Sequence, residues 1–391
     1  MRLQVILLRG LVSNIMRSCL RISKAKSCTL RLHYIKNFSA NMPDRKSQLQ
    51  KLQQSLPWTQ IPLVASAPMG GVATSDLAIA VSKSGGLGQL GFSGSVLGIQ
   101  MELEKVKEGL KDVISTEFLP VGVGIICLSN NVQPWLQLFR RYQPATVWLS
   151  FGTAHQFLTW TIGIRDVSPN TKIWIQLGDV TSAVEVAKVC RPDALVLQGS
   201  DAGGHGHAHG ASIVTLVPEV MDALEDEGLG DISIIAAGGI MDGRSAAAAI
   251  MLGASGVVMG TRYLGAEEAQ FDTDVREAVF QETDGGKNTV RSRVFDDLYG
   301  DNFWPETYDG RCLRGAIYQD FEAGMAIEEV QRNVYKASAK LGSGEAPIKD
   351  VMTVWAGTGV GMVKRLEKAG DITRTVREDA KKLLAGGSSW V

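Results

Sequence analysis

The residues with the clearest chemical potential lie in one short segment, residues 195–210, which reads LVLQGSDAGGHGHAHG. An apolar run ends at Gln198, and an acid, two glycines and His205 follow it. Gly203 and Gly204 carry no Cβ, so the backbone can approach a flat or phosphorylated ligand closely. Because an imidazole exchanges a proton near neutral pH, we predict that His205 is catalytic. A glycine-rich surface loop with solvated histidines is the alternative interpretation.

Glycines also follow two later apolar runs, in Ala236-Ala237-Gly238-Gly239-Ile240 and in Val258-Met259-Gly260-Thr261. The first of these segments is followed at once by Asp242-Gly243-Arg244, which opens a predicted helix. Backbone N–H groups in such turns and at helix starts bind phosphate. The pair of segments therefore predicts a phosphate cradle. Gly357-x-Gly359-x-Gly361 follows no apolar run, so we expect it to lie in a late helical region outside the site.

The first apolar run ends as Ala67-Pro68-Met69-Gly70-Gly71. A proline and two glycines there present bare main chain, against which a planar heterocycle can lie. Gly124, in the third apolar run, has no side chain and therefore leaves room for the same heterocycle. These segments predict that a planar, phosphorylated cofactor is bound by Ala67, Pro68, Met69, Gly124, Gly203, Gly204, Ala237, Gly238, Gly239, Met259, Gly260 and Thr261.

The remaining histidines suggest a metal site only weakly. His205, His207 and His209 alternate along an extended segment, as a transition-metal site would need. No carboxylate or thiol supplements them nearby, so we predict no metal and expect His207 and His209 to face solvent. His155 is predicted to begin a helix near the rim of the pocket.

Short apolar runs alternate with helical segments from residue 61 onward. As strands, these runs would position the candidate catalytic and cofactor-binding residues. The runs are 61–69, 87–92, 119–127, 146–151, 172–177, 194–198, 233–237 and 256–259. Strands that are apolar throughout are typical of a parallel sheet covered by helices. Eight βα units predict an α/β fold of the (β/α)8 TIM-barrel type, with the ligand residues on one catalytic face. A doubly wound open sheet is the alternative.

The pattern stops after the eighth run. Residues 266–325 are charged, aromatic and irregular, and predict a small subdomain or lid on the substrate side; an excursion packed against the side of the barrel is the alternative. Helices are expected at 326–341, 348–369 and 371–384. We therefore divide the chain into a leader (1–41), a barrel with C-terminal helices (57–265 and 326–385) and the small subdomain.

Composition narrows the function classes. The chain has 391 residues, 45% of them hydrophobic, and a net charge of −1, which gives no electrostatic argument for nucleic-acid binding. No apolar run is long enough for a membrane span. Five cysteines without a pairing pattern fit a reducing compartment. None of these features predicts the oligomeric state.

The first 41 residues differ from the rest, because they contain Arg, Lys and Ser but no Asp or Glu. That composition is typical of a mitochondrial transit peptide, which predicts a location in the mitochondrial matrix. If Met42 is the true start, the protein is expected in the cytoplasm. A plain basic tail is a further alternative.

Over about residues 61–385, the order of the motifs APM, QGxDAGGH, AAGGI and MGT resembles the nitronate monooxygenases, formerly called 2-nitropropane dioxygenases. The resemblance implies an FMN-dependent barrel in which Met69, Gln198, Gly204, Gly238, Gly239, Gly260 and Thr261 hold the flavin. It also implies that His205 lies beside the flavin as a base or an electrostatic anchor. The implied reaction oxidises a small alkyl nitronate, or a nitroalkane, with O2 to a carbonyl compound and nitrite.

Three positions depart from the family pattern. Asp201 stands where Glu is usual, Gly124 where Asn is common, and Thr358 where the late motif has Gln. Each departure can alter the position of the flavin or the choice of substrate. An NAD(P)H-dependent enoyl-thioester or quinone reductase on the same barrel stays open as an alternative. So does a flavin-binding protein without catalytic activity.

Overall fold

The computed structural model describes residues 45–92, 95–113, 118–128, 131–339 and 346–387. The predicted leader, residues 1–41, lies outside this range. Residues from Lys46 onward form one compact unit. No helix among the described residues has the length and apolar character that a bilayer crossing requires.

Eight parallel strands form one sheet in the order β1-β9-β8-β6-β5-β4-β3-β2. The strands are β1 (Leu63–Ser66), β2 (Gln89–Leu90), β3 (Leu119–Ile126), β4 (Pro144–Ser150), β5 (Lys172–Leu177), β6 (Ala194–Gln198), β8 (Ser233–Ala237) and β9 (Gly256–Met259). The two ends of the sheet meet between β1 and Leu87, which lies just before β2. The N–H of Ser66 donates to the carbonyl of Leu87, and the N–H of Leu87 donates to the carbonyl of Val64, both at 3.1 Å. The predicted (β/α)8 barrel is confirmed, and the open sheet is excluded.

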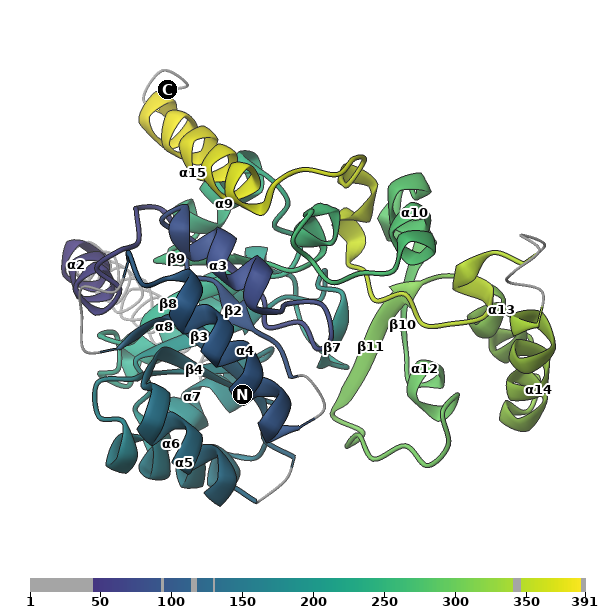
Figure 1. Ribbon diagram of the computed structural model, residues 1–391, viewed down its shortest axis with the longest axis horizontal. Coiled ribbons are helices and arrows are strands. Elements are labelled where there is room, and N and C mark those ends of the chain that lie inside the picture. Colours follow the sequence, from purple (N-terminus) through teal and green to yellow (C-terminus); the bar gives the residue numbers. More distant parts are fainter. Residues whose placement is uncertain (1–44, 93–94, 114–117, 129–130, 340–345, 388–391) are drawn as a thin grey trace, which may run out of the picture. The chain divides into compact units, whose positions relative to one another are not determined.

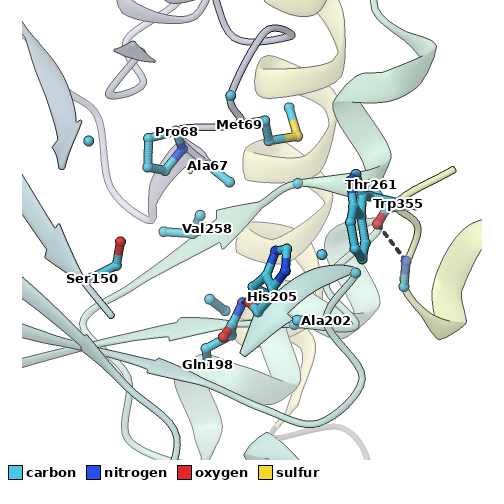
Figure 2. Close-up of a pocket in the computed structure, with 18 of the residues that line it drawn as sticks. Ala67, Pro68, Met69, Ser150, Gln198, Ala202, His205, Val258, Thr261 and Trp355 are labelled. Atoms are coloured by element: carbon cyan, nitrogen blue, oxygen red, sulfur yellow. Dashed lines mark hydrogen bonds between the residues drawn. The ribbon is translucent and has the colours of Figure 1, made fainter. Parts of the chain in front are cut away.

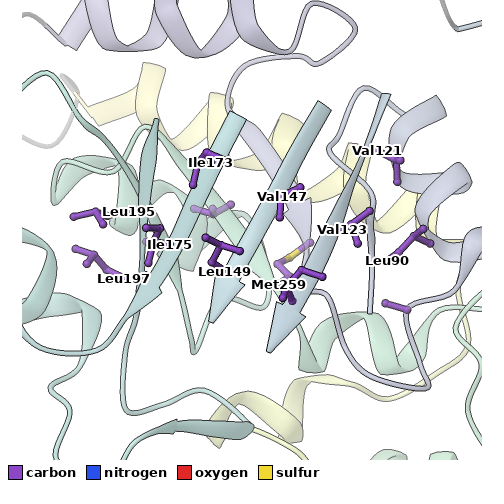
Figure 3. Packing of buried hydrophobic residues seen from close by; sticks show 14 of the residues in the cluster. Leu90, Val121, Val123, Val147, Leu149, Ile173, Ile175, Leu195, Leu197 and Met259 are labelled. Atoms are coloured by element: carbon purple, nitrogen blue, oxygen red, sulfur yellow. The ribbon is translucent and has the colours of Figure 1, made fainter. Parts of the chain in front are cut away.

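Helices surround this barrel (Figure 1). They are α3 (Ser75–Lys83), α4 (Val96–Gly109), α5 (Gln133–Tyr142), α6 (Ala154–Val167), α7 (Val180–Cys190), α8 (Ile213–Asp226), α9 (Gly243–Met251) and α15 (Ala369–Gly386). Outward-facing strand residues such as Val147, Ile173 and Leu195 pack against the helices (Figure 3). The helices bury the outer face of the strands and the barrel interior buries the inner face, which explains why the strand sequences are apolar throughout.

The inward-facing residues form a second core inside the barrel. Trp148, Trp174 and Val196 belong to it, and so do Leu52 and Leu56. Leu52 lies in α2 (Arg45–Ser55) and Leu56 directly follows it. Side chains from the segment before the first strand therefore pack with the inner core of the barrel. The predicted barrel boundary at residue 57 stays a prediction.

A second sheet, with the order β10-β11-β7, stands beside the barrel. Its strands are β7 (Gly204–His207), β10 (Thr289–Ser292) and β11 (Tyr308–Leu313), all antiparallel. Around it lie α10 (Thr273–Gln281), α11 (Gly285–Asn288), α12 (Val294–Asp297), α13 (Ala316–Glu322) and α14 (Ile327–Ser338) (Figure 1). Through β7, the segment after the eighth barrel strand is joined to the AGGH motif. The domain boundaries at 266 and 325 stay a prediction.

The late helical predictions are partly wrong. α14 and α15 form where helices were expected, but residues 348–368 are mostly irregular. Their helical structure is limited to two short 3-10 helices, η3 (Ile348–Asp350) and η4 (Thr358–Met362). Another 3-10 helix, η1 (Thr261–Gly265), lies elsewhere in the chain, directly after β9. Glycines at 357, 359 and 361 explain the difference, because glycine disfavours a continuous helix.

Candidate active site

A cavity of about 380 Å³ opens at the carboxyl ends of the barrel strands. This size is within the range of small-molecule and cofactor sites. The predicted residues that line it are Ala67, Pro68, Met69, Gly124, Gln198, Gly203, Gly204, His205, Ala237, Gly238, Gly239, Gly260 and Thr261. The structure thus brings the ends of strands that are distant in sequence to one face (Figure 2).

Met259 is the exception among the predicted residues. It is fully buried in the core between strands and helices and does not line the cavity. Its neighbour Val258 lines the cavity instead. Successive side chains of a strand point to opposite faces, so only one of these two adjacent residues can face the interior.

The glycine turns after β8 and β9 have the geometry of an anion cradle. Gly238 and Gly239 have φ values of 101° and 71°, which favour glycine over any residue with a Cβ. The N–H groups of Gly239 and Gly260 donate to no acceptor in the described part of the chain. A Cβ on Gly260 would lie 3.6 Å from the Cβ of Ala67 and 3.7 Å from the Sδ of Met69, two other residues of the cavity. These observations fit a bound phosphate.

His205 lies in strand β7 rather than in a free loop, and it pairs with Gly310 of β11. Its Nε2 is 2.8 Å from Oδ1 of Asp296, and the side chains are only 15% and 9% exposed. The indole of Trp304 stacks on the imidazole with 3.8 Å between ring centroids and 12° between the planes. The histidine is therefore held in one orientation by two residues of α12 and the following loop.

A chain of side-chain hydrogen bonds crosses the floor of the cavity. The indole N–H of Trp148 donates to Gln176, and Gln176 donates to the Oε1 of Gln198 at 2.9 Å. Gln198 in turn donates to the carbonyl of His205 at 3.0 Å. Gln198 lines the cavity as predicted, but both of its amide atoms are engaged within the protein: Nε2 donates to the AGGH strand and Oε1 accepts from Gln176.

An aromatic wall faces this floor. Phe151 lies edge-on to Trp304 and Tyr308, with centroid distances of 4.9 and 5.3 Å, and Trp355 approaches His205 at 4.7 Å. Burial raises the pKa of Tyr308 to about 12, so its hydroxyl stays neutral. Phe151 has a left-handed backbone, with φ of 57°, and such strain at a cavity wall persists only where the surrounding packing imposes it.

The expectation for the late glycine motif is wrong. Gly357 and Gly359 line the cavity, and the N–H of Gly357 donates to the Thr261 hydroxyl at 2.9 Å (Figure 2). A Cβ on Gly203 would overlap the backbone of Ala356 and Gly357. The motif is thus a tight turn packed against the AGGH loop, a contact that no local pattern indicates.

Two of the departures from the family pattern contact each other. The Thr358 hydroxyl donates to a carboxylate oxygen of Asp201 at 3.1 Å, and the Thr358 N–H donates to the Asp201 carbonyl at 3.0 Å. Asp201 is shorter than the usual Glu, and its partner Thr358 is shorter than the usual Gln. The third departure also has a local reason, because a Cβ at Gly124 would overlap the ring of Pro68.

The other histidines differ from one another. His207 is not solvent-facing as expected: its side chain is 9% exposed and its Nδ1 is 2.8 Å from Asp179. Burial lowers the pKa of His207, while Asp179 acts in the opposite direction. His209 is exposed, and His155 is an exposed residue at the start of α6.

Sequence reasoning missed several residues that complete the site. Asp296 and Trp304 belong to the irregular, aromatic segment 266–325, and no signal in their own sequence points to His205. Ser150, the last residue of β4, and Gln176, the next-to-last residue of β5, carry a usable signal, because polar residues near the end of an apolar run are candidates for a barrel's catalytic face. Both line the cavity.

A closed eight-stranded barrel, with glycine turns and one partly buried histidine lining a cavity at the carboxyl ends of its strands, is the architecture of (β/α)8-barrel enzymes. The family model for nitronate monooxygenase matches residues 50–379. The chain belongs to the nitronate monooxygenase family.

Curated relatives agree with this assignment. The chain is 39% identical over 344 residues to the nitronate monooxygenase npaC of Metarhizium robertsii, covering 86% of this chain and 95% of that protein. It is 34% identical over 380 residues to a nitronate monooxygenase of Neurospora crassa, covering 90% and 97%.

Solved structures share the fold. FabK of Thermotoga maritima has a TM-score of 0.66 at 23% identity, covering 87% of this chain and 99% of that one. A nitroalkane oxidase of Streptomyces ansochromogenes has a TM-score of 0.64 at 20% identity, covering 84% and 98%. At these identities the likeness concerns the barrel alone.

Proposed function

We propose that the protein oxidises small alkyl nitronates with O2 to carbonyl compounds and nitrite, using FMN. One observation carries the proposal: His205 is the sole ionisable side chain among the described residues that line the cavity. A nitronate is an anion, and a single imidazole in an otherwise uncharged cavity can bind it by a charge-assisted hydrogen bond. Family membership supports the same reaction.

The residues of the cavity fit FMN. The unpartnered N–H groups of Gly239 and Gly260 would bind its phosphate, and one phosphate suits a single cradle better than the pyrophosphate of FAD. The main chain at Ala67-Pro68-Met69, with Gly124 beside it, would lie against the flat ring. When bound, the flavin supplies the redox chemistry, and the protein supplies orientation and electrostatics.

The chain's own groups have distinct tasks in this reaction. His205 binds the nitro oxygens, and with a neutral nitroalkane its imidazole can accept the α-proton, a step worth about 10²–10⁴-fold. Phe151, Trp304 and Trp355 are apolar, so they limit water and favour a short alkyl substituent. No charged group in the described lining is available for a second acidic group on the substrate.

Purification and anaerobic reduction test this function. The protein should be yellow, and heat should release FMN rather than FAD. Without oxygen, an alkyl nitronate should bleach the flavin, whereas NADH and NADPH should not; with oxygen, nitrite should appear. Bleaching by NADH or NADPH alone would reject the proposal in favour of a reductase on the same barrel.

His205→Asn should retain the flavin but lose most nitronate turnover, because Asn can donate a hydrogen bond but carries no charge. His209→Asn is the matched control, since His209 is exposed, and it should behave as the wild type. Full activity of His205→Asn would remove the histidine from the mechanism.

The location is also a proposal. The basic, acid-free leader supports import into the mitochondrial matrix. A fluorescent fusion of residues 1–41 tests this, and a diffuse cytosolic signal would reject it.

A further inference from the structure

The carboxylate of Asp296 is the group closest to the ionisable nitrogens of His205. Its Oδ1 is 2.8 Å from Nε2. Its Oδ2 is buried and has no hydrogen-bond partner in the described part of the chain. The two residues are 91 positions apart in sequence, and Asp296 lies in α12, within the segment that follows the eighth barrel strand. The carboxylate thus has a single polar partner, which is the imidazole.

The chemistry of this pair determines where the imidazole carries its proton. An ionised carboxylate can only accept hydrogen bonds, so Nε2 must be the donor. The other ring nitrogen, Nδ1, has no partner among the described residues, and His205 lines the cavity. In the neutral ring Nδ1 is therefore an acceptor, and in the charged ring it is a donor.

The surrounding loop keeps the ring from rotating away from the carboxylate. Trp304 stacks on the imidazole at 3.8 Å. Arg293 holds the loop that carries this tryptophan, since its guanidinium donates to the carbonyls of Trp304, Pro305 and Tyr308 at 3.0 to 3.1 Å. Asp296 and Trp304 thus fix the imidazole at its edge and at its face.

We propose that Asp296 is the positioning residue of the site: it holds the proton of His205 on Nε2 and stabilises the charged imidazole that binds an anionic nitro group. This inference rests on the proposed function. The neutral ring then presents the lone pair of Nδ1 to a nitroalkane, and the charged ring presents an N–H to a nitronate.

Nitrogen NMR of the holoenzyme with ¹⁵N-labelled histidine tests the proton position directly. The signals of His205 are assigned by their loss in His205→Asn. We expect Nε2 to be protonated, with Nδ1 either unprotonated or, in the charged ring, also protonated. A His205 that carries its only proton on Nδ1 would overturn the inference, because Asp296 would then be the donor.

A double-mutant cycle tests whether Asp296 acts through His205. Asp296→Asn should lower kcat/KM for an alkyl nitronate by about 10- to 100-fold, the usual effect of removing a group that orients a functional histidine. In the His205→Asn background the same change should alter kcat/KM by no more than about twofold, because interacting residues are not additive. Equal losses in both backgrounds would overturn the inference.

Controls separate this role from a purely structural one and from the proposed function. Asp301→Asn removes an exposed carboxylate of the same segment and should leave kcat/KM unchanged. Flavin content of each variant reports folding, and the NMR measurement on the wild type decides the proton position even if Asp296→Asn does not fold. A wild type that oxidises no nitronate would refute the proposed function, while the NMR result would still decide the role of Asp296.

Discussion

Replacing Gly260 with valine separates cofactor binding from folding more cleanly than any other change in the cradle. Gly260 has φ of −104°, which residues with a Cβ readily adopt. Its Cβ would meet nothing closer than 3.6 Å. Gly239 is a poorer choice, because its φ of 71° would strain any other residue. The protein fold therefore tolerates a side chain at Gly260, whereas a ligand in the cavity does not.

The magnitude follows from two losses. The N–H of residue 260 would no longer reach an anionic oxygen, and a hydrogen bond to a charged group is worth about 1.5–3 kcal/mol. Forcing the valine methyl groups against a bound ligand costs about another 1–3 kcal/mol. Together these raise the Kd for FMN about 10²–10⁴-fold, at about 1.4 kcal/mol for each factor of ten.

Flavin released by heat from the purified variant, and fluorescence titration of the flavin-free protein with FMN, measure this change. The Tm of the flavin-free Gly260→Val protein should lie within about 2 °C of the wild type, since changes at unstrained open positions stay near 0.5 kcal/mol. Gly286→Val is the control, because that exposed glycine has nothing closer than 3.9 Å. Normal FMN affinity in Gly260→Val would place the phosphate elsewhere. A large drop in Tm would show that Gly260 serves folding instead.

Three further predictions concern other parts of the chain. Removing residues 1–41 should leave a soluble, flavin-loaded enzyme, because none of the predicted site residues belongs to that segment; loss of flavin on purification would contradict this. Burial lowers the pKa of His207, so the unfolded state binds this proton at a higher pH than the folded state, and the free energy of unfolding should fall as the pH drops below the ordinary value of 6.5. Denaturant titrations from pH 8 to pH 5 should show a weaker pH dependence in His207→Gln, and an unchanged slope would argue against the buried histidine. Gly124→Ala should lower the free energy of unfolding by about 1–3 kcal/mol through overlap with Pro68, and denaturant midpoints equal to the wild type would refute that packing argument.

Most of the barrel could be predicted from the sequence, because the pattern that indicates each strand lies within the strand itself. Strands β5, β6, β8 and β9 begin and end at the predicted residues, since a parallel strand covered on both faces is a continuous apolar run. The glycines after the last two strands were readable for a similar reason, because tight turns at strand ends need residues without a Cβ. Both features depend on neighbours a few positions away.

The sequence does not show which strand side chains point into the barrel and which point toward the helices. Val258 lines the cavity while Met259 lies in the outer core, and both are apolar. In a strand buried on both faces, hydrophobicity does not distinguish the interior of the barrel from the helix-covered side. The register of β9 with β1 and β8 decides it, and register is a property of the assembled sheet.

The parts of the site that come from outside the barrel could be placed only by the tertiary structure. Strand β7 has the sequence GHGH, without apolar residues, and becomes a strand because it pairs with β11 about a hundred residues later. That same pairing brings Asp296 and Trp304 to His205, and a separate tight turn brings Gly357 to Thr261. The sequence alone determined the barrel, and it located the glycine turns and the histidine that the structure places at the cavity. The folded chain decided which carboxylate and which aromatic ring hold that histidine, because contacts between distant segments leave no periodic trace in the residues that make them.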